Sequence, residues 1–160
     1  MRCSEASRGG GFVPEIGTPL GTVIRMRVAV GSDHAGFELK SRVVGASSEE
    51  SADYPLYAEL AARLVAGGEA ERGVVVCGSG VGVSIAANKV DGIRAVNARD
   101  AEEAEIGRRH NDANVLALAG RRLGERDAAA ILRAFLAADF EGGRHGRPVD
   151  QIAAIERRSQ

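Results

Sequence analysis

Cys77 and the glycines that follow it form the stretch of this chain whose residue types and spacing best suit chemistry. The thiol ends an apolar run of three valines, and glycines stand at positions 78, 80 and 82. A glycine-rich turn lets backbone N–H groups converge on one point, and the helix expected from residue 84 adds the positive end of its dipole. Both features favour a negative charge there. The segment therefore pairs a candidate base or nucleophile with an oxyanion cradle. The alternative is a buried strand cysteine beside a turn that serves packing alone.

Known glycine motifs do not fit this loop. A dinucleotide fingerprint needs a further glycine where the chain has Val83 or Ile85. A P-loop needs a lysine closer to the glycines than Lys89 is. A cysteine phosphatase signature needs an arginine at position 83, where this chain has valine. The loop is therefore not assigned to any of these three classes of site.

Two histidine-containing segments could bind a substrate or move protons. Asp33 and His34 follow directly on an expected strand, and a capping aspartate with an exposed histidine is the alternative there. His110 could move protons near neutral pH, and Asn111 could hold a sugar hydroxyl or an oxyanion. The alternative for this second segment is an ordinary polar turn.

Arginines on two further segments could bind a phosphate, because the guanidinium fork matches its oxygens. Arg144 and Arg147 follow a glycine pair, and Arg121 follows the last expected strand. A solvated surface loop is the alternative for both segments. No metal is indicated, because the three histidines are isolated in the sequence and none of them stands in zinc-site spacing.

The composition is typical of one globular domain. The chain has 160 residues, 44% of them hydrophobic, with 21 basic against 22 acidic side chains. No basic tract with interleaved aromatic residues indicates nucleic acid, and no apolar run is long enough to span a membrane. Two cysteines without a signal sequence predict a soluble cytoplasmic protein.

The chain divides into an N-terminal extension and one domain. Residues 1–25 are rich in Gly, Ser and Pro and lack periodicity, so we expect a disordered extension with a candidate natural start at Met26. Residues 26–160 alternate strands with helices, which predicts an α/β doubly wound parallel sheet with helices on both faces. The expected strands span residues 27–31, 74–77, 93–97 and 115–119. The expected helices span residues 37–43, 54–66, 84–90, 101–109, 127–138 and 150–158.

Ligands of such folds lie at the carboxyl ends of the strands. Such ends carry Asp33, Cys77 and the segment 97–100. For the helix over 54–66, we expect Leu56, Leu60 and Leu64 to supply the apolar face together with neighbouring alanines.

A series of motifs resembles one family in the same order along the chain. They span residues 31–40, 53–55, 77–82, 84–89, 92–95, 110–116 and 141–145. The family is that of the type B ribose-5-phosphate isomerases and their relatives, the galactose-6-phosphate isomerase subunits. The resemblance runs from Met26 nearly to the end of the chain. A second branch of the family uses a glutamate where this chain has Val83, so the chain resembles the cysteine branch.

The resemblance implies interconversion of ribose 5-phosphate and ribulose 5-phosphate through an enediolate, without metal or cofactor, in the pentose phosphate pathway. It assigns proton transfer between C2 and C1 to Cys77 and opening of the sugar ring to His110. Asn111 would help to hold the enediolate, and Arg121 and Arg144 would bind the phosphate. The full set of substrate contacts that the resemblance implies is Asp33, His34, Tyr54, Gly78, Ser79, Gly80, Val81, Gly82, Asn111, Arg121, Arg144 and Arg147.

The family builds its sites between two subunits, so the resemblance implies a homodimer or a dimer of dimers. This chain departs from the family pattern at two places. The chain is shorter between Lys40 and Asp53, so the second strand of the expected order 2-1-3-4-5 is shortened or missing. Pro148 stands where the family usually has arginine, and Arg147 is the candidate replacement. The alternatives are an isomerase of galactose or allose 6-phosphate and a remnant that binds sugar phosphates without turnover.

Overall fold

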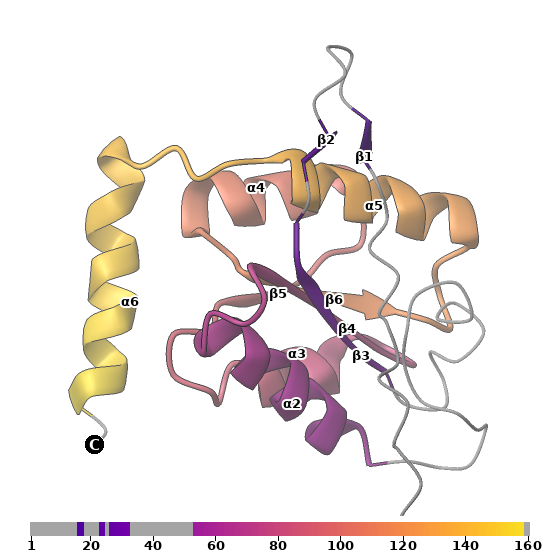
Figure 1. Ribbon diagram of the computed structural model, residues 1–160, viewed down its shortest axis with the longest axis horizontal. Coiled ribbons are helices and arrows are strands. Elements are labelled where there is room, and N and C mark those ends of the chain that lie inside the picture. The colour runs from indigo at the N-terminus through magenta and orange to yellow at the C-terminus, as the bar shows by residue number, and fades with distance from the viewer. Residues whose placement is uncertain (1–15, 18–22, 25, 33–52, 159–160) are drawn as a thin grey trace, which may run out of the picture.

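The computed structural model describes residues 16–17, 23–24, 26–32 and 53–158. Four parallel strands form its main sheet: β3 (Val28–Ser32), β4 (Arg72–Cys77), β5 (Ala95–Asn97) and β6 (Val115–Ala119). Four helices lie on the two faces of this sheet: α2 (Tyr54–Ala66) and α3 (Val81–Ala87) on one, α4 (Ala101–Asn111) and α5 (Glu125–Ala137) on the other (Figure 1). The expected doubly wound α/β fold is confirmed.

The order of the strands corrects one detail of the expectation. The sheet runs β3-β4-β6-β5, whereas the order 2-1-3-4-5 placed β5 between β4 and β6. All five residues of β6 are buried, while the three residues of β5 are only half-buried. A strand that is apolar on both faces belongs in the centre of a sheet, so β6 displaces the shorter strand to the edge.

The core consists of two layers, one on each face of the sheet. Successive strand residues point to opposite faces, so Val75 and Cys77 pack towards α2 and α3. Val74 and Val76 pack towards α4 and α5, where the buried Phe135 fills the second layer. The continuous apolar run of β4 is therefore explained by burial on both faces.

The buried face of α2 differs from the expected one. Its buried residues are three alanines and Val65, whereas Leu56, Leu60 and Leu64 are exposed. The helix lies close against β3, since a Cβ on Gly31 would come within 2.4 Å of the Tyr57 carbonyl oxygen. Small side chains permit this close approach, and the leucines are left on the outer face.

The C-terminal region is more helical than expected. A 3-10 turn, η2 (Gly143–His145), leads directly into α6 (Gly146–Arg158), which stands beside the sheet layers (Figure 1). Pro148 lies in the first turn of α6, where its missing N–H costs no helical hydrogen bond. None of the helices in the described part of the chain is long and apolar enough to cross a membrane.

Several expectations concern residues outside the described ranges. They are the helix over 37–43, the shortened segment before Asp53, and the candidates Asp33 and His34. Of the first 25 residues the structure describes only β1 (Ile16–Gly17) and β2 (Val23–Ile24), which pair antiparallel.

Candidate active site

Cys77 lies at the carboxyl end of β4 and is 5% exposed. The backbone N–H of Gly80 points at its sulfur, with an N–Sγ distance of 3.2 Å. The Cys77 carbonyl accepts a hydrogen bond of 2.8 Å from the N–H of Gly120, which follows the end of β6. The thiol is thus held at the expected edge of the sheet, with a backbone donor turned towards it.

Only glycine fits position 80 of the loop. Its φ of 74° is left-handed, and a Cβ there would lie 2.4 Å from Oδ1 of Asn97. The same Asn97 side chain donates to the carbonyl of Ser79 at 3.4 Å. The Ser79 hydroxyl accepts from the N–H of Val81 at 3.3 Å. The loop is therefore tight, and its path is set by backbone groups and one amide from β5.

Two larger side chains flank this loop. The ring of Tyr54 lies against Gly82, where a Cβ would come within 2.7 Å of it. The guanidinium of Arg121 lies beside Gly78, where a Cβ would be 3.3 Å from Nε. The structure therefore brings together the thiol, the loop, a tyrosine and an exposed arginine, all at one end of the sheet.

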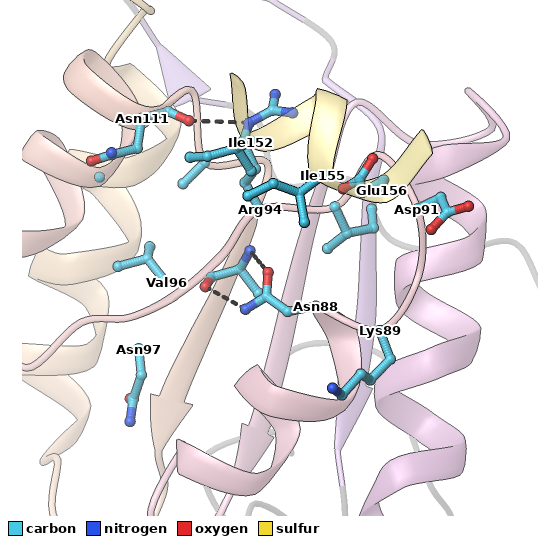
Figure 2. A pocket seen from close by; sticks show the side chains of 14 residues that line it. Asn88, Lys89, Asp91, Arg94, Val96, Asn97, Asn111, Ile152, Ile155 and Glu156 are labelled. Carbon is cyan, nitrogen blue, oxygen red and sulfur yellow. Dashed lines mark hydrogen bonds between the residues drawn. The ribbon is translucent and has the colours of Figure 1, made fainter. Parts of the chain in front are cut away.

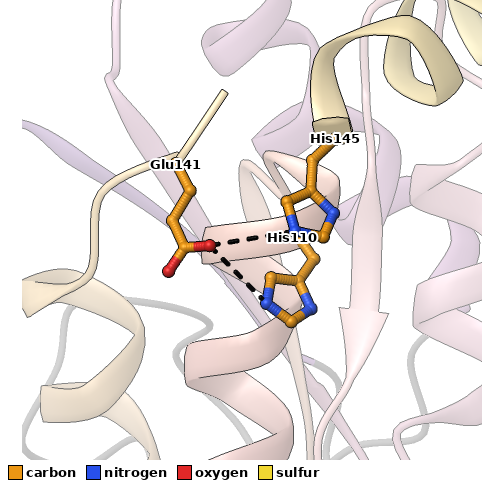
Figure 3. A group of neighbouring side chains, drawn as sticks. All are labelled: His110, Glu141 and His145. Atoms are coloured by element: carbon orange, nitrogen blue, oxygen red, sulfur yellow. Dashed lines mark ion pairs between the residues drawn. The ribbon is translucent and has the colours of Figure 1, made fainter. Parts of the chain in front are cut away.

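A second group of polar side chains gathers at the end of α4. The rings of His110 and His145 are stacked with their centroids 4.1 Å apart and their planes 6° apart. Oε2 of Glu141 lies 3.8 Å from Nε2 of each histidine (Figure 3). We call these three residues the histidine cluster.

Arginines on either side orient the histidine cluster. Arg109 binds Oε1 of Glu141, with an Nε–Oε1 distance of 2.7 Å, and this hydrogen bond holds the pKa of the carboxyl below its usual value. Nε of Arg144 donates to Nε2 of His145 at 3.1 Å. Desolvation first, then the neighbouring His110 and Arg144, lower the pKa of His145. The neutral imidazole is therefore the favoured form of His145.

The donor atoms of the histidine cluster lie within 4.8 Å of one another, as a metal site would require. Their directions do not fit one. The nitrogen lone pairs of stacked rings lie in two nearly parallel planes that do not meet, whereas a zinc ion needs lone pairs that converge on it at about 2.0–2.1 Å. In addition, Arg109 and Arg144 already occupy two of the acceptors and bring positive charge.

The Cys77 loop and the histidine cluster lie at opposite ends of the sheet. Cys77 pairs with Ala119 at the carboxyl ends of β4 and β6. The Asn111 carbonyl, in contrast, accepts from Nε of Arg94, which immediately precedes β5, at 3.1 Å. Since α4 crosses from the carboxyl end of β5 back to the amino end of β6, the last turn of α4 lies far from the thiol.

The candidates thus fall into two sets. Cys77, the loop, Tyr54 and Arg121 form one, while His110, Asn111 and Arg144 belong to the other end. Arg147 lies exposed in the first turn of α6.

From the sequence alone, Glu141 and His145 have no assigned role, and Asn97 is placed only at the carboxyl end of a strand. The spacing of four residues between Glu141 and His145 gave no reliable signal, because Gly142 and Gly143 have positive φ and the segment between them is not an α-helical turn.

A groove of about 800 Å³ connects the two ends on the β5 side of the molecule. Asn97 borders it at the thiol end and Asn111 at the other (Figure 2). Ile152 and Ile155 of α6 form one wall, and Asn88 at the end of α3 lies opposite (Figure 2). The Asn88 amide bonds both the N–H and the carbonyl of Ala95, at 2.8 and 2.9 Å.

Comparison with known proteins identifies similar chains. Residues 28–152 match the family model described as Ribose/Galactose Isomerase. Ribose-5-phosphate isomerase B of Escherichia coli is 46% identical over 145 residues, which cover 82% of this chain and 97% of that protein.

Solved structures are similar over the same extent. Ribose-5-phosphate isomerase B of Clostridium thermocellum superimposes with a TM-score of 0.81 at 41% identity, covering 84% of this chain and 100% of that one. The Mycoplasma genitalium ribose-5-phosphate isomerase B, solved with bound ribulose 5-phosphate, gives a TM-score of 0.74 at 35% identity. That match covers 81% of this chain and 95% of the other.

Proposed function

Since the chain belongs to the ribose/galactose isomerase family, we propose that it interconverts ribose 5-phosphate and ribulose 5-phosphate. The observation that carries the proposal is the buried thiol at the end of β4 with a loop N–H turned towards it. We place the reaction in the pentose phosphate pathway and in the cytoplasm, where reducing conditions keep Cys77 as a thiol.

In the proposed mechanism Cys77 acts as the base. Its thiolate takes the proton from C2 of the open aldose, the C–H electron pair forms the C1–C2 double bond, and O1 becomes negatively charged. The sulfur then returns the proton to C1, while the O2 proton passes to O1 and C2 becomes the carbonyl. Backbone donors of the loop at residues 78–82 stabilise the enediolate, an effect worth about 3–4 kcal/mol per donor in other enzymes.

Ribose 5-phosphate exists mainly as a closed ring, so ring opening must precede this step. We assign it to His110, which takes the proton from the O1 hydroxyl and delivers it to the ring oxygen as the C1–O4 bond breaks. Asn111 then helps to hold the enediolate, and Arg121 and Arg144 bind the phosphate. Asp33 and His34 remain predicted contacts of the substrate.

These roles require two copies of the chain. The base and the ring-opening histidine lie at opposite ends of one sheet, so no single substrate reaches both within one subunit. We propose a homodimer in which Cys77 of one protomer faces His110 of its partner. A dimer of dimers keeps the same pairing.

The groove beside β5 is the face we propose for this contact. Asn97, which contacts the loop, and Asn111 both line it, so a twofold axis across it brings opposite ends of the two sheets together. Val81 and Ile85 on α3 are 51% and 58% exposed and share a helical face with Asn88. Ile152 and Ile155 of α6 add apolar surface on the other wall.

The test is turnover of ribose 5-phosphate by the purified chain in the presence of EDTA, with Cys77→Ala alongside. We expect activity with EDTA and a loss of about 10²–10⁴-fold in the variant. Galactose 6-phosphate and allose 6-phosphate serve as competing substrates. A folded protein that turns over only a hexose phosphate, or that binds sugar phosphates without turnover, would overturn the pentose assignment.

A further inference from the structure

We infer that Glu141 and His145 are positioning residues that hold the His110 imidazole in place for opening the sugar ring. The inference rests on the proposed function, in which His110 moves the proton from O1 to the ring oxygen. Neither residue is assigned a contact with the substrate.

The stack fixes the plane of the His110 ring. His145 lies parallel to it, 4.1 Å between centroids, and comes from η2, a different element of the chain. A half-buried imidazole at the end of a helix otherwise rotates about its side-chain bonds. Packing one ring face against His145 therefore holds the edge of His110, with its two nitrogens, in one direction.

Glu141 supplies a fixed carboxylate at that edge. Its Oε1 is taken by Arg109, the residue next to His110, which leaves Oε2 facing Nε2 of His110 at 3.8 Å. The backbone is held as well, because the N–H of Glu141 donates to the carbonyl of Arg109 at 3.0 Å. One turn of α4 therefore carries the histidine and also anchors the carboxylate that orients it.

His145 leaves that carboxylate available. Nε2 of His145 accepts from Arg144, so its proton is on Nδ1 and the ring is neutral. The negative charge of Glu141 is then free to stabilise the imidazolium that forms when His110 takes the O1 proton. At 3.8 Å this is charge stabilisation, the electrostatic part of the support that a hydrogen-bonded aspartate gives to a catalytic histidine.

Hydrogen exchange on the open-chain ketose separates this role from a general structural one. Ribulose 5-phosphate cannot close a five-membered ring, because the hydroxyl it would need carries the phosphate. It therefore enters the site open, and Cys77 can exchange its C1 hydrogen for solvent deuterium through the enediolate without the ring-opening step. Turnover of ribose 5-phosphate, in contrast, requires that step. Deuterium uptake into unconverted ribulose 5-phosphate and turnover of ribose 5-phosphate are both measured with the full-length protein.

The variants are Glu141→Gln, which keeps the shape but removes the charge, and His145→Ala, which removes the stack. We expect kcat/KM for ribose 5-phosphate to fall about tenfold or more, as for other residues that orient a functional histidine. The rate of deuterium uptake into ribulose 5-phosphate should not fall by more than about twofold. His145→Phe retains a stacked ring and should recover most of the loss.

Glu105→Gln is the matched control, because Glu105 is the other carboxylate that pairs with Arg109, at 2.8 Å. It should leave both rates unchanged. Equal losses of turnover and of deuterium uptake for Glu141→Gln, or no loss of either, would overturn the inference. An inactive wild type would instead refute the proposed function. If His145→Ala does not fold, Glu141→Gln and His145→Phe still decide the question.

Discussion

Cys77 and His110 lie at opposite ends of the same parallel sheet. Cys77 ends β4 beside Ala119, the last residue of β6. His110 lies in the last turn of α4, which leads to the first residue of β6. The length of β6 alone separates these levels by about 13 Å. The proposed reaction uses both groups, so it depends on the dimer proposed above.

Hybrid dimers test this arrangement directly. Cys77→Ala and His110→Asn should each lose activity, while an equal mixture, unfolded and refolded together, should recover about a quarter of the wild-type rate. Half of the randomly assembled dimers are hybrids, and each hybrid has one intact site of two. Native mass spectrometry confirms that hybrids form. Hybrids without recovered activity would show that both groups act within one protomer.

Ile85 tests which face makes the contact. Ile85→Glu introduces a charge on the exposed face of α3 beside the groove, so we expect a monomer in light scattering and little turnover. Leu60→Glu is the matched control, because Leu60 is 62% exposed on the outer face of α2. A dimer that tolerates Ile85→Glu but not Leu60→Glu would move the interface to α2.

The sequence predicted the elements best where periodicity and boundary residues agree. The helix Tyr54–Ala66 and the strand Val115–Ala119 have the expected bounds, since proline and a glycine pair delimit the first and burial on both faces marks the second. The outward leucines of α2 were not predictable in the same way. Both faces of that helix are apolar, and only its close packing against β3 decides which one is buried.

Only one part of the candidate site could be predicted from the sequence. Cys77 and its loop are contiguous in sequence, so their close approach could be predicted from spacing. The histidine cluster joins the end of α4 to a segment beyond α5, and this contact depends on how that segment docks. The isolated histidines of the sequence therefore predicted no pair, although two of them are stacked.

Gly80 and Gly68 provide a matched test of the loop. Both have a φ of +74°, but a Cβ on Gly68 meets nothing within 4 Å, whereas one on Gly80 meets Asn97. Gly68→Ala should cost about 1 kcal/mol from backbone strain alone. Gly80→Ala should cost about 1–3 kcal/mol more through overpacking, and should lower kcat by displacing the N–H that faces Cys77. Chemical denaturation and turnover measure the two effects. Equal stability losses would contradict the close contact with Asn97.

Asp112 links the two arginines behind His110. It accepts from Arg94 at 2.6 Å and from Arg108 at 2.7 Å, and Arg108 is 2% exposed. Asparagine at position 112 tolerates the left-handed backbone of Asp112. The substitution Asp112→Asn nevertheless leaves the buried guanidinium of Arg108 without its counter-charge. We expect a loss of about 3 kcal/mol in unfolding free energy. Glu105→Gln, at an exposed pair, should cost less than about 1 kcal/mol. Similar costs for the two variants would contradict the importance of burial at Arg108.

The lowered pKa of His145 predicts how stability depends on pH. Desolvation, His110 and Arg144 disfavour the charged imidazole in the folded state, while Glu141 opposes them. The unfolded chain therefore binds more protons just below pH 6.5, the ordinary value, and the free energy of unfolding falls as the pH is lowered through it. His145→Phe lacks this contribution. Between about pH 8 and about pH 5.5, the wild type should lose more stability than the variant, because all other titrating groups are common to both. Parallel stability curves would show that His145 takes up its proton equally in the folded and unfolded chains.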